Sequence, residues 1–167
     1  MDIQEARPHE AGSISRVLRA SWQAAYRGIV NDAYLDSLKE DHWTPFLEEG
    51  LSTGRIHCLV MKQGDSVVGV SVTRKSLISG YKEDGELVCL YLLPGCIGKG
   101  WGGQLLHAAE AVLAKQGYTH CALDVLAGNE RAIGFYHANG YLDTGTRMEA
   151  ELGGQRLACL VLRGELE

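Results

Sequence analysis

The residues that most suggest chemistry lie in the stretch PGCIGKGWGGQLL, which places five glycines within ten residues and then continues as a helical pattern. The first turn of a helix has about four backbone N–H groups without an intrahelical partner, at the positive end of the helix dipole. Glycines at positions 98, 100, 102 and 103 would leave these groups open to a phosphate or pyrophosphate. A sharp turn without a ligand is the alternative, but one glycine normally suffices for a turn, and each costs about 0.5–1 kcal/mol relative to alanine.

The glycine spacing also fits a dinucleotide-binding motif. Gly98, Gly100 and Gly103 form a GxGxxG pattern, and Asp124 follows about 20 residues later, near the position of a ribose-binding acid. However, residues 94–97 separate the glycines from the preceding strand, and Asp124 lies within the apolar run CALDVL rather than at a strand end. Only about 40 residues follow, too few for the rest of a doubly wound sheet. A dinucleotide-binding protein is therefore the less favoured alternative, and a P-loop fits poorly because no GK[ST] sequence occurs.

A second segment, LDVLAGNERAIGFYHANGY, also places polar groups at helical spacing. Four of its residues share one helix face: Asn129, Ala132, Ile133 and Tyr136. Asn129 would cap the helix, Ala132 leaves room beside it, and Tyr136 adds a hydroxyl two turns further on, which suits a long, thin ligand. The alternative is that Asn129 is only a cap and that Tyr136 belongs to an aromatic core.

These two segments need a sheet to position them. Apolar periodicity predicts helices over residues 13–26, 43–51, 101–115 and 129–138, and a short helix capped by Asn31-Asp32. β-branched and apolar runs predict strands over 3–7, 56–62, 66–73, 86–93 and 120–126, and a last hairpin that turns at Gly153-Gly154. The run ELVCLYLL, Glu86–Leu93, is typical of a central strand buried on both faces. Hairpins combined with a strand–helix–strand unit predict an α/β sheet that is only partly parallel.

Composition indicates a single folded domain over residues 1–167. Hydrophobic residues make up 46% of the chain, and no linker, repeat or low-complexity block divides it. The formal net charge of -5 argues against a nucleic-acid surface, and no apolar run reaches the roughly 18 residues of a membrane helix. The polar, acidic start is not typical of a signal or transit peptide. Five cysteines without a CxxC pair, and six histidines without ligand spacing, predict buried thiols in a cytoplasmic protein with no metal site.

The glycine-rich stretch resembles motif A of the GNAT superfamily of acyl-CoA-dependent N-acyltransferases, Q/R-x-x-G-x-G/A, with Ile97 where Gln or Arg is usual. Because the phosphate contacts of this motif come from backbone amides, the departure weakens the match more than the function. The segment Leu123–Tyr141 is similar to the family's motif B, L-x-V-x-x-x-N-x-x-A-x-x-F-Y-x-x-x-G-F/Y. The order and spacing of the motifs also fit, so the resemblance covers nearly the whole chain. It implies a mixed, mostly antiparallel sheet of about 6–7 strands with a central parallel pair, flanked by about 4–5 helices.

The resemblance implies acetyl-CoA as the cosubstrate and assigns its contacts. The pyrophosphate would lie on the glycine loop: Gly98, Lys99, Gly100, Trp101, Gly102 and Gly103. Asn129 and Tyr136 would line the pantetheine arm. In this family the strand before motif A splays from its neighbour, and Leu92 and Leu93 match the positions whose backbone pairs with pantetheine. Backbone N–H groups near Leu92 and Leu93 could also hold a tetrahedral oxyanion.

The resemblance further implies acetyl transfer to a primary amine of a small molecule or peptide by direct attack. Glu86 matches a general-base glutamate, and Tyr136 matches a tyrosine near the CoA sulfur that could protonate the leaving thiolate. Trp22, Tyr26 and Arg27 lie where the first helices shape the acceptor pocket. The alternatives are a solvated carboxylate at a strand end for Glu86, and core packing at i, i+4 for Trp22 and Tyr26.

One further functional class is left open. A non-catalytic, acyl-CoA-binding regulatory module would bind CoA but release no thiol with any amine. No nucleic-acid or membrane partner is expected, and the terminal hairpin could supply an exposed edge for a homodimer.

Overall fold

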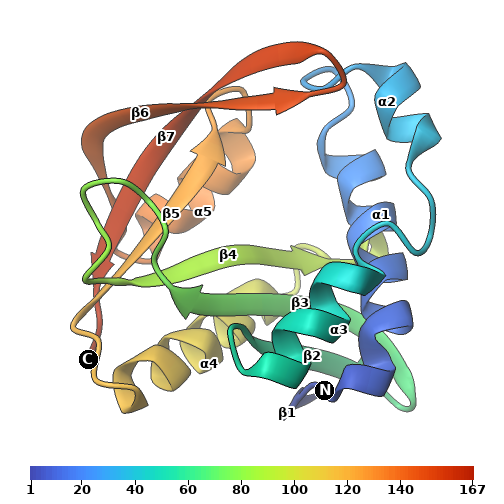
Figure 1. The fold of residues 1–167 in the computed structure, drawn as a ribbon, viewed down its shortest axis with the longest axis horizontal. Coiled ribbons are helices and arrows are strands. Elements are labelled where there is room, and N and C mark those ends of the chain that lie inside the picture. Colours follow the sequence, from blue (N-terminus) through green and yellow to red (C-terminus); the bar gives the residue numbers. More distant parts are fainter.

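The computed structural model describes all 167 residues, which form one seven-stranded sheet with helices on both faces. The strands follow the order β1-β2-β3-β4-β5-β7-β6 across the sheet (Figure 1). Their bounds are β1 Asp2–Glu5, β2 His57–Gln63, β3 Ser66–Lys75, β4 Gly85–Leu92, β5 His120–Leu126, β6 Leu142–Leu152 and β7 Gln155–Glu165. The α-helices are α1 Ala11–Ala25, α2 Asp32–Ser37, α3 Thr44–Thr53, α4 Trp101–Lys115 and α5 Glu130–Ala138, with short 3-10 turns η1 at Pro8–Glu10 and η2 at Pro94–Cys96.

The sheet is mixed, with a single parallel pair at its centre. Every neighbouring pair of strands is antiparallel except β4 and β5. Helix α4 connects these two strands, which is the crossover that a parallel pair requires. The expected fold class is therefore confirmed, with seven strands, one central parallel pair and five α-helices.

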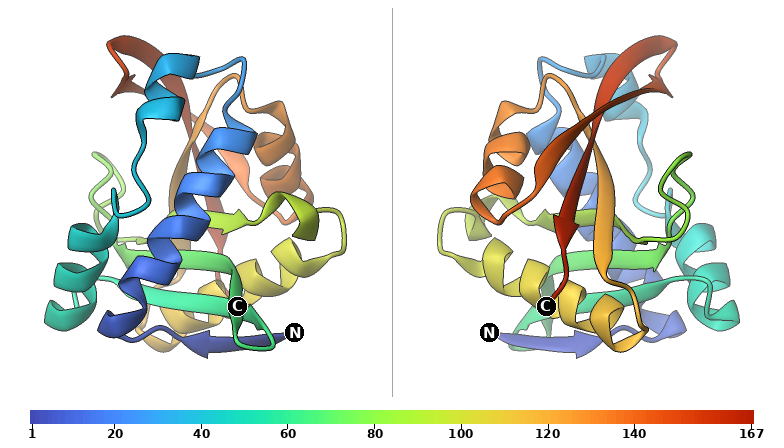
Figure 2. Two further views of the ribbon diagram at one scale, coloured as in Figure 1. Left: turned by 90° about the vertical axis from the view of Figure 1, so that its right-hand side faces the viewer. Right: turned by 90° about the vertical axis from the view of Figure 1, so that its left-hand side faces the viewer.

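Helices α1 and α3 cover one face of the sheet, and α4 and α5 cover the other (Figure 2). On the α4 face, Leu105 and Leu113 pack with Leu123 of β5 in the largest core cluster. On the α1 face, Ile14 packs in a second cluster that includes Val70 of β3. The central strands are therefore packed on both faces, whereas no residue of the edge strand β6 is buried.

Local sequence signals account for several element ends. The side chain of Asn31 accepts a hydrogen bond from the backbone N–H of Ala33 at 2.8 Å and caps α2, as expected. Gly153 and Gly154 both have positive φ angles, 57° and 76°, which is the backbone that a two-residue hairpin turn requires. The turn sets the long β6–β7 hairpin in register.

Strand β4 departs from the expectation that Glu86–Leu93 is buried on both faces. It pairs with β5 only at Gly85 and Glu86. From Val88 to the end of the strand, its residues are only half-buried. The expectation was wrong for this part because an apolar run does not reveal that the neighbouring strand turns away.

A β-bulge in β4 accompanies the loss of pairing. Thr73 of β3 lies opposite Leu87, while Val72 lies opposite Cys89, which leaves Val88 as an extra residue. Bulges bend a strand and increase its twist. Strands β4 and β5 therefore diverge beyond Glu86 (Figure 1). We call their unpaired parts, residues 88–92 of β4 and 123–126 of β5, the β4–β5 opening.

Candidate active site

The glycine loop presents a row of free backbone donors. Gly98 and Gly100 have φ angles of 82° and 78°, and α4 begins directly afterwards at Trp101. The backbone N–H groups of residues 98–103 donate no hydrogen bond within the chain. A Cβ built on Gly98, Gly100 or Gly103 would meet no atom within 4 Å. The loop is therefore an open cradle of donors at a helix N-terminus, which is the arrangement that binds phosphate.

The other residues of the loop have different surroundings. A Cβ on Gly102 would lie 3.4 Å from the ring of Phe135, an ordinary contact distance, so this glycine faces α5. The ammonium group of Lys99 lies 4.8 Å from the centre of the Trp101 ring, which holds a cation beside the cradle. Ile97 is 38% exposed, and because it is apolar it places no charge beside the loop.

Helix α5 carries Tyr136 and is capped by Asn129. The Asn129 side chain accepts a hydrogen bond from the N–H of Ala132 at 3.2 Å, so its capping role is present. Tyr136 packs in the core cluster beside Phe135 and Tyr141. Its hydroxyl is not among the buried polar atoms that lack a hydrogen-bond partner. Burial raises the pKa of Tyr136 well above its usual value, so the hydroxyl keeps its proton at neutral pH.

The two backbone groups predicted to face the cosubstrate differ. The N–H of Leu93 donates to the carbonyl oxygen of Val68 at 2.8 Å, so the structure contradicts its expected role as a free donor. Because backbone groups alternate in direction along a strand, the N–H of Leu92 points to the opposite edge of β4, towards the β4–β5 opening. The carbonyl of Leu92 points the same way and accepts a hydrogen bond from Ser21 at 3.2 Å. Of these two residues, only Leu92 has a backbone N–H group that is free to donate to an oxyanion.

Glu86 is held inside the protein by two partners. One carboxylate oxygen lies 2.9 Å from a guanidinium nitrogen of Arg74, and the other accepts from the N–H of Leu77, also at 2.9 Å. The residue is only 2% exposed. A solvated carboxylate, the alternative considered from the sequence, is therefore wrong. Both oxygens of Glu86 are engaged inside the protein, so neither is free to meet an acceptor amine directly.

Asp124 is a second carboxylate at this part of the sheet. It is exposed although it lies in the middle of β5, because β4 no longer pairs with β5 at this level. The surrounding protein still removes enough water to raise its pKa, and the negative charge of Glu86 raises it further. Sequence reasoning considered Asp124 only as a ribose-binding acid. The signal that could have identified its exposed position is an acid inside the apolar run CALDVL, because a carboxylate there needs an opening beside the strand.

Aromatic side chains line the α1 side of the opening. The hydroxyls of Tyr26 and Tyr91 are 2.6 Å apart, which joins α1 to β4. Trp22 packs edge-on against Tyr26, with ring centres 4.9 Å apart, and against Trp43 at 5.2 Å. Burial raises the pKa of Tyr26 to about 12. The structure thus brings Trp22 and Tyr26 to the strand that bears the opening, together with Tyr91 and Trp43, which sequence reasoning did not identify.

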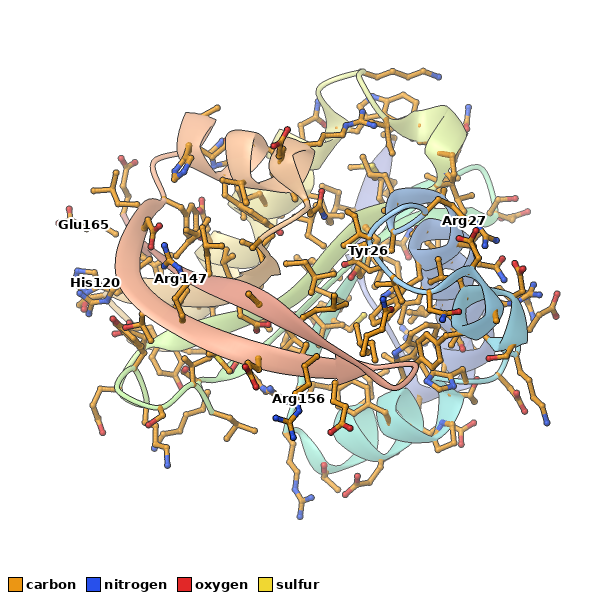
Figure 3. The ribbon with its side chains drawn as sticks, turned by 90° about the horizontal axis from the view of Figure 1, so that it is seen from above. Tyr26, Arg27, His120, Arg147, Arg156 and Glu165 are labelled. Carbon is orange, nitrogen blue, oxygen red and sulfur yellow. The ribbon has the colours of Figure 1, made fainter.

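Arg27 does not join this group. Its guanidinium contacts Asp36 at 2.6 Å and Asp32 at 3.3 Å, and so links the end of α1 to α2. Figure 3 shows Tyr26 pointing into the molecule, whereas Arg27 lies at the periphery. The expected contact between Arg27 and an acceptor is not supported, because two carboxylates already hold this side chain outside the opening.

The comparisons with known proteins agree with this geometry. The sequence model described as the acetyltransferase (GNAT) family matches residues 16–141. The chain belongs to the GNAT acetyltransferase family. The matched residues of this GNAT protein include the glycine loop, the β4–β5 opening and helix α5.

Two similar sequences carry acetyltransferase names. A spermidine N(1)-acetyltransferase of Thermoplasma acidophilum is 26% identical over 148 residues, which cover 84% of this chain and 88% of the relative. An uncharacterized N-acetyltransferase of Mycobacterium bovis is 33% identical over 116 residues, covering 64% of this chain and 72% of the relative. Both relatives are thus named as N-acetyltransferases, in agreement with the family.

Solved structures show the same fold. PaiA N-acetyltransferase from Thermoplasma acidophilum, crystallised with coenzyme A, superimposes with a TM-score of 0.76 at 22% identity over 98% of each chain. YncA, a putative acetyltransferase from Salmonella typhimurium with acetyl-CoA, gives a TM-score of 0.74 at 22% identity, covering all of this chain and 94% of YncA. In this GNAT protein, no helix combines the length and the apolar character needed to cross a membrane. Its histidine, cysteine and acidic side chains form no group of three or more that could hold a metal ion.

Proposed function

We propose that this GNAT protein transfers the acetyl group of acetyl-CoA to a primary amine of a small molecule or peptide. The observation that carries the proposal is the row of unpartnered N–H groups at residues 98–103, directly beside the half-buried edge of β4. These N–H groups can hydrogen-bond a pyrophosphate without the help of any side chain. The adjacent opening offers an extended ligand a backbone edge with which to pair.

Acetyl-CoA fits the residues that are present. Its pyrophosphate would be held by the glycine loop, with Lys99 beside it, and its pantetheine arm would run along β4 towards the N–H of Leu92. When bound, it supplies an acetyl group activated as a thioester. The Leu92 N–H faces the opening and would stabilise the negative charge that develops on the carbonyl oxygen during attack.

Tyr136 is proposed as the donor of the proton that the leaving thiolate needs. Its hydroxyl stays protonated at neutral pH because burial disfavours the phenolate. A thiol with a pKa near 8.5 leaves tolerably well without help, so this role should accelerate the reaction rather than permit it.

The acceptor amine must lose a proton before it attacks. An amine with a pKa near 10.4 costs about 4.6 kcal/mol to deprotonate at pH 7, whereas an α-amine near 7.8 costs about 1 kcal/mol. An alkyl amine therefore needs a base in the opening far more than a peptide α-amine does. Glu86 is the base that the sequence suggested, but both of its oxygens are engaged by Arg74 and Leu77. Asp124, the second carboxylate at this part of the sheet, is therefore also a candidate for this step.

Thiol release from acetyl-CoA, measured against a panel of amines, tests the proposal. Because a similar sequence is named a spermidine N(1)-acetyltransferase, spermidine heads the panel, followed by simple alkyl amines and amino-acid amides. Amine-dependent thiol release together with an acetylated amine supports the proposal. Binding of CoA with no thiol release for any amine would instead favour the regulatory module.

A further inference from the structure

Asp124 occupies a distinctive place in the sheet. Its neighbours along β5, Leu123 and Val125, belong to the core cluster under α4, so Asp124 projects from the opposite face. It lies two residues beyond Ala122, the last residue of β5 that pairs with β4. On its other side, Asp124 lies opposite Val161 of β7. The carboxylate therefore stands at the start of the β4–β5 opening, on the face that α1 covers.

Asp124 has no partner of its own. The two buried carboxylates of this region are paired: Glu86 with Arg74 at 2.9 Å and Asp84 with Arg163 at 2.7 Å. Asp124 forms neither a salt bridge nor a hydrogen bond with another side chain, and it remains exposed. Because no cation of the protein pairs with this carboxylate, it is available to a group that enters the opening.

The groups around Asp124 come from every element that packs against the opening. Those close enough to interact electrostatically are Glu86 of β4, Arg74 of β3, Tyr26 of α1, Tyr136 of α5 and Cys159 of β7. Glu86 and Arg74 are the charged members, and they are paired with each other. No unpaired cation is present to compete with a cationic substrate for Asp124.

We propose that Asp124 is the catalytic carboxylate that binds the acceptor as an ammonium ion and removes its proton, which rests on the proposed acetyl transfer. The N–H bond of the ammonium group breaks, the proton moves to a carboxylate oxygen of Asp124, and a neutral amine remains. As the amine nitrogen forms its bond to the acetyl carbon, the carbon–sulfur bond breaks. The thiolate takes a proton from Tyr136, the new amide loses its second proton to water, and Asp124 and Tyr136 return to their starting states through solvent.

The same arrangement indicates the class of acceptor. Trp22, Tyr26 and Tyr91 supply aromatic rings on the α1 side of the opening, and aromatic faces attract ammonium groups. Asp124 supplies the counter-charge, while Arg27 is held outside by Asp32 and Asp36. The opening therefore favours an alkyl ammonium substrate over an acceptor that carries a carboxylate beside its amine.

Glu86 has a different part in this proposal. Its bonds to Arg74 and to the N–H of Leu77 fix the loop after β3 to the start of β4. Its negative charge also keeps the proton affinity of Asp124 high. Glu86 is thus a positioning residue that acts through Asp124.

The test compares Asp124→Asn and Asp124→Glu with the wild type and with Asp65→Asn, which removes an exposed carboxylate from the β2–β3 turn. Burial favours the uncharged form of Asp124, so Asp124→Asn should fold at least as stably as the wild type at neutral pH. With an alkyl amine at pH 7, we expect kcat to fall by about 10²–10⁴-fold in Asp124→Asn and to recover in part in Asp124→Glu. Asp65→Asn should match the wild type.

The pH profile separates proton removal from binding. The defect of Asp124→Asn should shrink as the pH approaches the amine pKa of about 10.4, and it should be small for an α-amine with a pKa near 7.8. A wild-type kcat in Asp124→Asn, or a rise in KM alone that is independent of pH, would overturn the proposal. If the wild type binds acetyl-CoA but releases no thiol with any amine, the proposed acetyl transfer itself fails, which is distinguishable from both of those results.

Discussion

Gly100 and Gly117 offer a matched test of the glycine loop, because they flank the two ends of the same helix. Gly100 precedes α4 with φ 78°, and Gly117 follows it with φ 95°. A Cβ on either glycine would meet no atom within 4 Å, so alanine adds backbone strain without a clash. Left-handed backbone costs a non-glycine residue about 1–2 kcal/mol. Both variants, Gly100→Ala and Gly117→Ala, should therefore lose about 1–2 kcal/mol of stability, or about 2–8 °C in Tm.

Only Gly100→Ala should lose affinity for acetyl-CoA. The strain in Gly100→Ala bends the loop backbone, so the cradle N–H groups no longer point directly at the ligand. A loss of about 1–2 kcal/mol of hydrogen bonding to the pyrophosphate then lowers the affinity about 5–30-fold. Isothermal titration calorimetry with acetyl-CoA measures this loss, and urea unfolding of the free proteins measures the strain.

Two results would refute this reasoning. Wild-type affinity in a destabilised Gly100→Ala would show that the backbone of the loop does not hold the ligand. An equal loss of affinity in Gly117→Ala would show that weaker binding follows from lower stability in general, and not from the cradle.

Three more variants test other parts of the account. Tyr136→Phe should lower kcat, but the folded variant should still bind acetyl-CoA and keep measurable activity. An unchanged kcat in steady-state assays would remove the acid role. Glu86→Gln leaves Arg74 without its counter-ion and should cost about 1–3 kcal/mol in urea unfolding, because the carboxylate is buried and the guanidinium partly exposed; a pH-dependent rescue of its kcat like that of Asp124→Asn would mean that Glu86 shares the proton transfer. Arg27→Ala should leave KM for the amine near the wild-type value, because Asp32 and Asp36 hold this side chain outside the opening. A large rise in KM would return Arg27 to the acceptor pocket.

The fold was largely predictable from the sequence because its elements carry local signals. The strand over 120–126 matches β5, and the turn at Gly153-Gly154 and the cap at Asn31 lie where the sequence placed them. These features depend on apolar spacing, on two left-handed glycines and on a side chain that bonds its own helix. Each can be recognised within a few neighbouring residues.

The failures concern contacts between segments that are distant in the sequence. Nothing near Glu86 reveals that Arg74 and the N–H of Leu77 will occupy its oxygens. Similarly, the apolar run of β4 does not reveal that β5 leaves it after two paired residues. The loss of pairing exposes Asp124, and the pairing with Arg74 withdraws Glu86. The choice between these two carboxylates is therefore a property of the tertiary structure.

Thermal unfolding with and without acetyl-CoA, with NAD(H) and ATP as controls, tests the central claim most directly. A ligand present at 100 times its Kd should add about 2.7 kcal/mol of stability. We predict a rise in Tm with acetyl-CoA alone, and its reduction in Gly100→Ala. A rise with NAD(H) and none with acetyl-CoA would contradict the account and would make the GxGxxG pattern a dinucleotide site.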